Sequence, residues 1–176
     1  MTTTIRRADE SDASALSILA SATFELACPP QTTRAAIDAF VAEFLSPTSF
    51  AGYLADPARA LFLAEDDGRA VGYTMLVLTA PKDPDVAAAL TLHPSAELNK
   101  VYVAEDHHGA GVASGLVDAS IAVALERGAA GLWLGVNQQN ARANRFYEKS
   151  GFRQVGERKF LVGGTYESDF VRERAL

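Results

Sequence analysis

The residues with the clearest chemical potential lie between positions 101 and 115. A strand predicted over residues 97–103 leads into a turn with two glycines, and the apolar spacing after Gly111 predicts a helix. The first N–H groups of a helix have no partner within the helix and lie at the positive end of its dipole. Glycine lets the main chain approach a ligand closely. The turn is therefore expected to bind phosphate oxygens through its backbone amides.

Two well-known phosphate loops do not match this turn. The dinucleotide fingerprint needs a third glycine where this chain has Ser114, and no acidic residue ends the following strand. The ATP and GTP loop ends in Gly-Lys followed by Ser or Thr, and this chain contains no Gly-Lys pair. Neither a dinucleotide nor a nucleoside triphosphate is therefore expected at the turn.

A second motif follows near the C-terminus. Asn140, Ala143 and Tyr147 are spaced by three and four residues, which places them on one face of a predicted helix. With the turn, this motif resembles the GCN5-related N-acetyltransferases (GNAT), whose loop reads Arg/Gln-x-x-Gly-x-Gly/Ala and whose later motif reads Asn-x-x-Ala-x-x-x-Tyr. The chain departs from the family where His108 replaces Arg or Gln. The resemblance covers nearly the whole chain.

The resemblance implies acetyl-CoA as co-substrate and no metal ion. Backbone groups of Val101 and Val103 would pair with the pantetheine arm, while Asn140 would either bond the cofactor or simply cap its helix. The pyrophosphate would lie on the turn and the start of the next helix, which supply His108, Gly109, Ala110, Gly111, Val112 and Ala113.

Tyr147 is implied by the resemblance to be the acid of the reaction. Its hydroxyl would lie near the coenzyme sulfur and give a proton or a hydrogen bond to the leaving thiolate. The ordinary pKa values of a tyrosine, about 10, and of a thiol, about 8.5, make this transfer reasonable. The alternative is an aromatic residue of the core.

Glu97 is the candidate general base. The attacking amine has an ordinary pKa of about 10.4, so it must lose a proton before or as it attacks. Regular alternation along a strand predicts that Glu97 and Val101 share a face about 13 Å apart, so water would relay the proton. A charge that binds a cationic acceptor is the other role open to Glu97.

These residues point to an N-acetyltransferase in which a primary amine of a small molecule attacks the thioester directly. A looser resemblance to the PaiA-type branch, which acetylates polyamines, makes a polyamine the expected acceptor. That resemblance is carried by Thr23-Phe24, Trp133-Leu134-Gly135-Val136, Phe146-Tyr147-Glu148-Lys149, Gly156, Phe160, Gly163 and Asp169. One alternative is a protein N-terminal or lysine acetyltransferase, and another is a regulatory module that binds acyl-CoA without catalysis.

The elements that must position these residues fit one α/β domain over residues 1–176. The 176 residues are 48% hydrophobic and 22% charged, which is a globular composition. Strands are predicted over residues 4–8, 61–64, 71–78, 97–103, 131–136, 154–162 and 166–173, with helices between them. We expect a mixed, mostly antiparallel central sheet flanked by helices, and the resemblance implies that it is splayed between its fourth and fifth strands.

Composition argues against several other classes of protein. A net charge of −6 lacks the basic footprint of nucleic-acid binding. No apolar run reaches the roughly 18 residues of a membrane span, and no apolar segment follows Arg6-Arg7 as in a secretory signal. The single cysteine, Cys28, and the spacing of the three histidines predict neither a disulfide nor a metal site. We expect a cytoplasmic protein, and the family resemblance adds a homodimer to the expectations.

Overall fold

The computed structural model describes residues 2–176. Its central sheet has seven strands in the order β1-β2-β3-β4-β5-β7-β6, and only β4 and β5 run parallel. The elements in chain order are β1 (Thr4–Arg7), η1 (Glu10–Asp12), α1 (Ala13–Ala27), α2 (Arg34–Phe44), α3 (Pro47–Ala55), β2 (Arg59–Asp66), β3 (Arg69–Val77), α4 (Pro84–Ala89), β4 (Ser95–Val103), η2 (Glu105–His107), α5 (Val112–Glu126), β5 (Gly131–Asn137), α6 (Ala141–Lys149), β6 (Arg153–Val162) and β7 (Thr165–Ala175).

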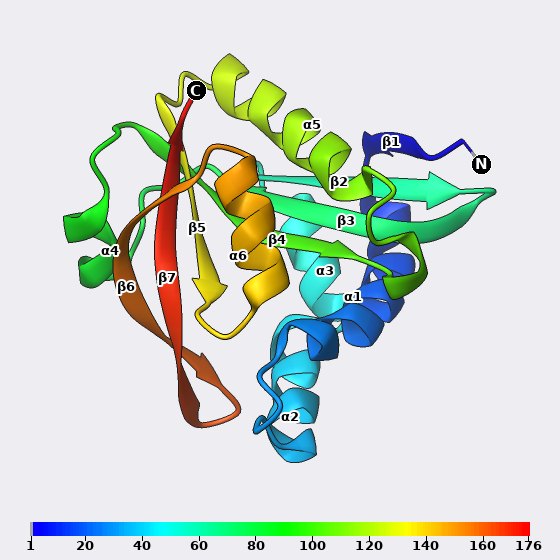
Figure 1. The fold of residues 1–176 in the computed structure, drawn as a ribbon. Helices are drawn as coiled ribbons and strands as arrows, with labels where there is room; N and C mark the ends of the chain where they lie inside the picture. Colours follow the sequence, from blue (N-terminus) through cyan, green and yellow to red (C-terminus); the bar gives the residue numbers. More distant parts are fainter. Residues whose placement is uncertain (1) are drawn as a thin grey trace.

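The predicted α/β fold with a mixed, mostly antiparallel sheet is confirmed. β4 and β5 pair only from Ser95 with Gly131 to Glu97 with Trp133, although both strands continue beyond this point. The sheet is therefore splayed between its fourth and fifth strands. Figure 1 shows the consequence: β5, β7 and β6 run across the direction of β2, β3 and β4.

Helices cover both faces of the sheet. On one face, α1, α2 and α3 pack a core that includes Phe24, Phe40 and Phe50 against side chains of β2 and β3. On the other face, α5 and α6 pack with β2 to β5 through a second core that includes Leu116 and Tyr147. The splayed gap between β4 and β5 thus lies between two helical layers.

The hairpin between β2 and β3 is tighter than the predicted turn over residues 66–69. The two strands reach Asp66 and Arg69, so the turn consists of Asp67 and Gly68 alone. Both residues have positive φ angles, 50° and 78°, as a two-residue hairpin turn requires. Pairing with β1 and β3 extends β2 by two residues at each end beyond the short apolar run that predicted it.

Glu173 of β7 ties the loop after α4 to the sheet. Its side chain is fully buried (0% exposed) and accepts hydrogen bonds from the backbone N–H groups of Thr91 (3.0 Å) and Leu92 (3.3 Å). The hydroxyl of Thr91 and the guanidinium of Arg153 also donate to it. These four donors fill a carboxylate that would otherwise be buried without compensation.

Glu173→Ala is expected to lower the free energy of unfolding by about 2–4 kcal/mol, because it leaves buried donors without an acceptor. Urea denaturation followed by circular dichroism measures the change. Glu157→Ala, on the exposed part of β6, is the control and should change stability by about 0.5 kcal/mol or less. Equal stability of the two variants would contradict the prediction.

Candidate functional site

The glycine turn joins η2 to α5 and forms one wall of the site. Gly109 and Gly111 both have φ of +81°, a conformation that other residues rarely adopt. Gly111 is the N-cap of α5, whose first internal hydrogen bond runs from the N–H of Gly115 to the carbonyl of Gly111 (3.1 Å). The amides of residues 112–114 therefore have no partner within the helix and can receive an anion.

His108 begins this turn and is held at both ring nitrogens. Its Nε2 donates to the carbonyl oxygen of Val103 at 2.8 Å, and its Nδ1 accepts from the guanidinium of Arg142. Because a guanidinium can only donate, Nδ1 is the acceptor in the contact with Arg142, and Nε2 is the donor to Val103. His108 thus links the end of β4 to α6.

Arg142 was not among the predicted site residues. It lies in the first turn of α6 and lines the same cavity as the glycine turn. Among residues 2–176, no carboxylate lies within 4.0 Å of its guanidinium. The sequence indicates only that an arginine lies within the second motif. The position of α6 beside the glycine turn is what places this arginine at the cavity.

The edge of β4 that faces the splayed gap is free of sheet pairing beyond Glu97. The N–H of Ala104 bonds to Val71 on the β3 side. Backbone groups alternate in direction along a strand, so those of Val103 and Val101 point to the opposite edge. The two valines expected to pair with an extended ligand therefore share this edge, although the carbonyl oxygen of Val103 already accepts from His108.

The helix α6 carries the second motif. The side chain of Asn140 accepts from the N–H of Ala143 at 3.1 Å, so Asn140 caps the helix. Arg172 of β7 anchors the helix from behind through a hydrogen bond to Asn144 (3.0 Å) and an ion pair with Glu148 (3.0 Å). These contacts fix the face of α6 that carries the predicted acid.

Tyr147 lies on that face and is 8% exposed. Its ring packs edge-on against Phe146 and Phe152, with centroid separations of 5.2 and 5.7 Å. Burial raises the pKa of its hydroxyl above the ordinary value. Tyr147 is therefore neutral at physiological pH and able to donate a hydrogen bond.

Two cavities meet at Tyr147. The smaller, about 330 Å³, is lined by the glycine turn, the start of α5 and Arg142. The larger, about 650 Å³, is lined by residues of α1, α2, α3, β4 and the β6–β7 hairpin. Val101, Ala143 and Tyr147 line both. The splayed gap thus connects a cavity suited to an anion with a second cavity on the far side of β4.

A bulge in β4 corrects one prediction. Leu76 pairs with Leu98 and Met75 pairs with Lys100, so Asn99 has no partner in β3. An extra residue reverses the alternation of faces. Glu97 and Val101 were expected to share a face, and the bulge puts them on opposite faces instead.

Glu97 itself accepts a hydrogen bond from the side chain of Asn99 at 2.8 Å, and it does not line either of the two cavities. Lys100, which the sequence analysis did not single out, lines the larger cavity. Regular alternation predicts Lys100 on the face opposite Glu97, whereas the bulge puts both on the same face. A bulge has no reliable signature in a single sequence, so this position of Lys100 could not be predicted.

The larger cavity has aromatic walls and charges of both signs. Phe24, Phe40, Phe44, Tyr53 and Phe160 line it, with the cations Arg59, Lys100 and Arg158 and the acids Glu167 and Asp169. Both acids are almost fully buried. Burial raises the pKa of Asp169, against the opposing charge of Arg158. The cavity can therefore hold a small ligand that is partly apolar and partly charged.

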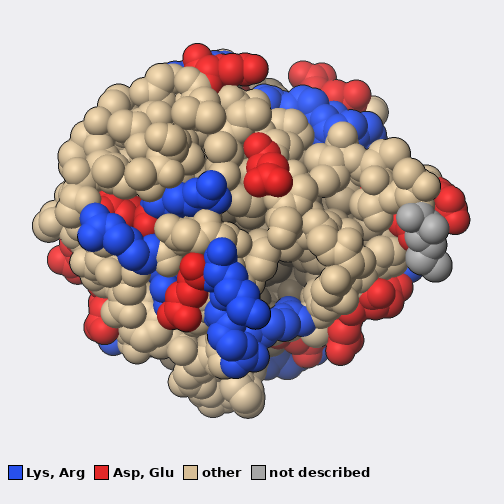
Figure 2. Space-filling view, turned by 45° about the horizontal axis from the view of Figure 1, so that its top comes forward, with Lys and Arg blue, Asp and Glu red and all other residues tan. Residues whose placement is uncertain are grey.

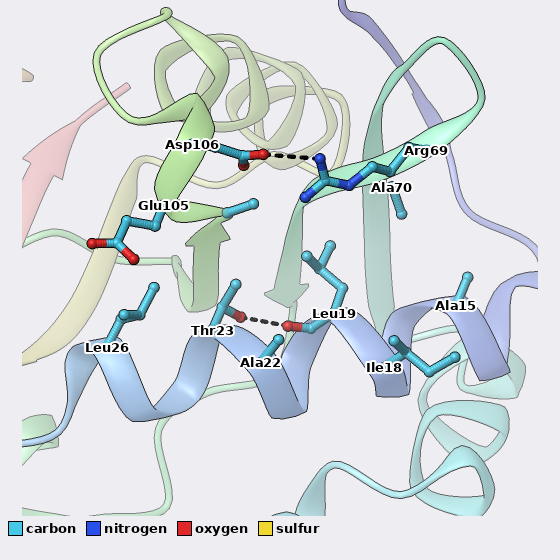
Figure 3. Close-up of a pocket in the computed structure, with 11 residues that line it drawn as sticks. Ala15, Ile18, Leu19, Ala22, Thr23, Leu26, Arg69, Ala70, Glu105 and Asp106 are labelled. Carbon is cyan, nitrogen blue, oxygen red and sulfur yellow. Dashed lines mark hydrogen bonds and ion pairs between the residues drawn. The ribbon is translucent and has the colours of Figure 1, made fainter.

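A third cavity, about 760 Å³, lies outside this site. It separates α1 from the segments around Arg69 and Asp106, which form an ion pair at 2.8 Å (Figure 3). The helix α1 supplies six of its eleven lining residues, among them Ile18, which is 73% exposed. It contains none of the predicted site residues and does not share the walls formed by Val101 and Tyr147.

Charge on the surface is distributed unevenly. Although the net charge is −6, the face in Figure 2 carries a cluster of Lys and Arg side chains beside a hollow. No group of three or more His, Cys, Asp or Glu residues within the described range 2–176 could hold a metal ion. No helix of that range is long and apolar enough to cross a membrane.

Comparison with known proteins places these features in context. Residues 22–152 match the model of the acetyltransferase (GNAT) family. An uncharacterized N-acetyltransferase of Mycobacterium tuberculosis is 43% identical over 165 residues, which cover 94% of this chain and 98% of the relative.

Solved structures share the fold at low sequence identity. The PaiA N-acetyltransferase of Thermoplasma acidophilum, solved in complex with coenzyme A, superimposes with a TM-score of 0.80 at 18% identity, covering both chains fully. The ribosomal-protein-S18-alanine N-acetyltransferase of Escherichia coli gives 0.69 at 19% identity, over 99% of this chain and 94% of that one. The name of the second protein states a protein acceptor, whereas the name of the first states only the acetyltransferase activity.

Proposed function

The chain belongs to the acetyltransferase (GNAT) family, and on that basis we propose that it transfers an acetyl group from acetyl-CoA to a primary amine of a small molecule. Family membership makes the chain an acyltransferase with acetyl-CoA as its co-substrate. The observation that carries the proposal is the junction of the two cavities at Val101, Ala143 and Tyr147. A thioester held from one side would there meet an amine from the other.

The residues of the smaller cavity fit coenzyme A. Gly109 and Gly111, both with positive φ, have no side chain to cover the main chain of the turn. The amides of residues 112–114 lack partners within the helix, and Arg142 adds a positive charge. These groups would hold the pyrophosphate. The open edge of β4 at Val101 and Val103 would hold the pantetheine arm by strand-like pairing.

Tyr147 would act on the sulfur. The bound thioester supplies an activated acetyl carbon, and attack by the amine breaks the bond between that carbon and sulfur. A hydroxyl that is buried and neutral can donate to the departing thiolate. The backbone N–H of Val101 would polarise the acetyl carbonyl, and held proximity supplies the remainder of the acceleration.

The proton of the attacking ammonium group needs an acceptor. Glu97 remains the candidate base, since it lies on the same face of β4 as the larger cavity. Because it does not line that cavity, it would accept the proton through water. A volume of about 650 Å³ with aromatic walls suits a small molecule rather than a protein segment.

A polyamine is the cationic candidate for the acceptor. The observation in its favour is the pair of buried acids, Glu167 and Asp169, which would face its ammonium groups. Asp169 is already engaged by Arg158 at 3.3 Å, which leaves Glu167 as the acid with its charge available.

The direct test is release of coenzyme A from acetyl-CoA in the presence of amines, followed by thiol detection and mass spectrometry of the product. We expect turnover with at least one small amine from a panel of polyamines, amino acids and aminoglycosides. Turnover confined to peptide N-termini or lysine side chains would instead assign a protein acceptor. Binding of acetyl-CoA without transfer to any acceptor would overturn the proposed function.

Arg142→Gln is expected to raise KM for acetyl-CoA about tenfold with kcat nearly unchanged, since a charged hydrogen bond to phosphate contributes about 1.5–3 kcal/mol. Steady-state kinetics with acetyl-CoA varied at saturating amine measures this. Arg145→Gln, on an exposed position of the same helix, is the control and should leave both constants unchanged. An unaltered KM in the Arg142 variant would remove Arg142 from cofactor binding.

A further inference from the structure

Lys100 occupies an unusual position in the larger cavity. It lies directly after the bulge of β4, opposite Met75 of β3, and its side chain lines the cavity wall. Within residues 2–176, no carboxylate approaches its ammonium group to 4.0 Å. Burial lowers the pKa of Lys100 to about 8, and the charge of Glu97 opposes this only in part.

The two other cations of the cavity are already paired. Arg59 forms an ion pair with Asp56 at 3.1 Å, and Arg158 forms one with Asp169 at 3.3 Å. Both arginines add positive charge around Lys100 and help to lower its pKa. Lys100 is thus the cation of this cavity whose charge has no counterpart in the described protein.

Glu167, the acid of the cavity that forms no ion pair among the described residues, does not lie beside Lys100. Glu167 acts on Cys28 at the end of α1, where its charge contributes to a pKa of about 11 for the thiol. Among residues 2–176, the carboxylate whose charge raises the pKa of Lys100 is that of Glu97. The cavity is therefore negative near Cys28 and positive near Met75, which suits a ligand that carries both signs of charge.

A half-buried ammonium group with no carboxylate of residues 2–176 within 4.0 Å is costly to a fold, and an anionic ligand would reduce that cost. We propose that Lys100 binds a carboxylate on the acceptor, so that the acceptor is a small amine bearing a carboxylate rather than a polyamine. This inference rests on the proposed acetyl transfer and narrows its substrate class.

The size of the cavity limits the shape of the acceptor. Lys100 and Val101 both line the larger cavity, whose volume is about 650 Å³, and Val101 also lines its junction with the smaller one. An acceptor with its amine at the junction and its carboxylate at Lys100 must fit within this one cavity, as an amino acid does. The aromatic walls from α1, α2 and β6 would take an apolar side chain.

The experiment compares amines that differ only by the carboxylate. Phenylalanine is paired with phenethylamine, methionine with 3-(methylthio)propylamine, and spermidine represents the polyamines. We expect kcat/KM of the wild type to be at least about tenfold higher for the amino acid of a pair than for its decarboxylated partner.

Lys100→Met keeps the length and apolar stem of the side chain and removes its charge. This variant should lose the preference for the carboxylate while its kcat/KM for the decarboxylated amine stays within about twofold. Lys149→Met, at the exposed end of α6, should keep the preference. Because the variant removes a half-buried charge that has no ion-pair partner in the described part of the chain, its Tm should also be equal to or above that of the wild type, which excludes loss of folding as the cause.

Two results would overturn the inference while acetyl transfer stands. One is equal or better turnover of spermidine and the decarboxylated amines by the wild type. The other is an equal fall in kcat for every amine in Lys100→Met, which would make Lys100 a proton acceptor instead of an anion site.

A binding measurement separates this inference from the proposed function. Calorimetry on protein saturated with coenzyme A compares N-acetylphenylalanine with N-acetylphenethylamine. Tighter binding of the carboxylate, lost in Lys100→Met, supports the anion site even where no amine is turned over. Equal binding of both compounds overturns it.

The same measurement has a defined pH dependence. As pH rises through about 8, Lys100 loses its proton, so affinity for N-acetylphenylalanine should fall above that pH, by up to about tenfold per pH unit. The charged groups that face Lys100 are Glu97, Arg59 and Arg158, and carboxylates and guanidinium groups do not ordinarily titrate between pH 7 and 10. A flat profile would contradict the inference.

Discussion

Gly111→Asp should weaken the binding of acetyl-CoA about 100-fold, equivalent to about 2.7 kcal/mol. The substitution places a carboxylate at the N-cap of α5, where the unpartnered amides of residues 112–114 are proposed to hold the pyrophosphate. The carboxylate would itself accept from those amides and repel the phosphates. Calorimetric titration with acetyl-CoA measures the dissociation constant.

Two controls separate charge from backbone strain. Gly111→Asn has nearly the same shape without the charge, and asparagine tolerates a positive φ, so it should lose no more than a fewfold in affinity. Gly68→Asp sits in the β2–β3 turn at φ of +78° with open space around it, and it should bind acetyl-CoA like the wild type. Equal losses in the Asp and Asn variants of Gly111 would show that charge at this N-cap is irrelevant.

Tyr147→Phe should lower kcat at least about tenfold, with KM for acetyl-CoA changed by less than about threefold. The hydroxyl is proposed to donate to the leaving thiolate, a contact that strengthens only as the bond to sulfur breaks. The ring keeps its packing against Phe146 and Phe152, so the fold should survive. Pre-steady-state release of coenzyme A measures the chemical step directly.

Tyr166→Phe is the matched control, because Tyr166 is 68% exposed in the β6–β7 hairpin. It should leave kcat unchanged. An unchanged rate in Tyr147→Phe would remove the hydroxyl from the reaction and leave only a packing role for this residue.

Local patterns were enough to predict most of the elements. The helix α5 begins directly after Gly111, as the apolar spacing predicted, and α6 has Asn140 as its N-cap, because asparagine is a strong helix-start signal. The short η2 helix (Glu105–His107) was not predicted. It arises where β4 ends and the chain must turn toward α5, and three residues provide no periodicity to detect.

The contents of the larger cavity were much less predictable. The bulge at Asn99 depends on how β3 and β4 pair, with Leu76 opposite Leu98, 22 residues later, and it decides which side chains face α1. As a result of the bulge, Val101 lies on the face opposite Glu97, and Lys100 lines the larger cavity. The charges of the cavity also come from β2, β6 and β7, which no single segment reveals.

Arg142 illustrates the same limit on the cofactor side. Its partner, His108, is 34 residues away in sequence, so neither residue alone indicates the contact. The family pattern identifies the first position of the loop as unusual, but only the packing of α6 beside the turn brings a cation to that place.

The larger cavity reaches α1, α2 and α3, the smaller reaches α5, and the two share only the walls formed by Val101, Ala143 and Tyr147. Neither acetyl-CoA nor the amine then has to enter through the cavity of the other, so either substrate can bind first. For the same reason, neither coenzyme A nor the acetylated amine blocks release of the other product. Double-reciprocal plots of the initial rate should therefore give intersecting lines, as for a ternary complex, rather than the parallel lines of a ping-pong mechanism with a covalent acetyl-enzyme. Because the amine and the thioester are proposed to meet at this junction, a compound that links both partners there would occupy both cavities at once.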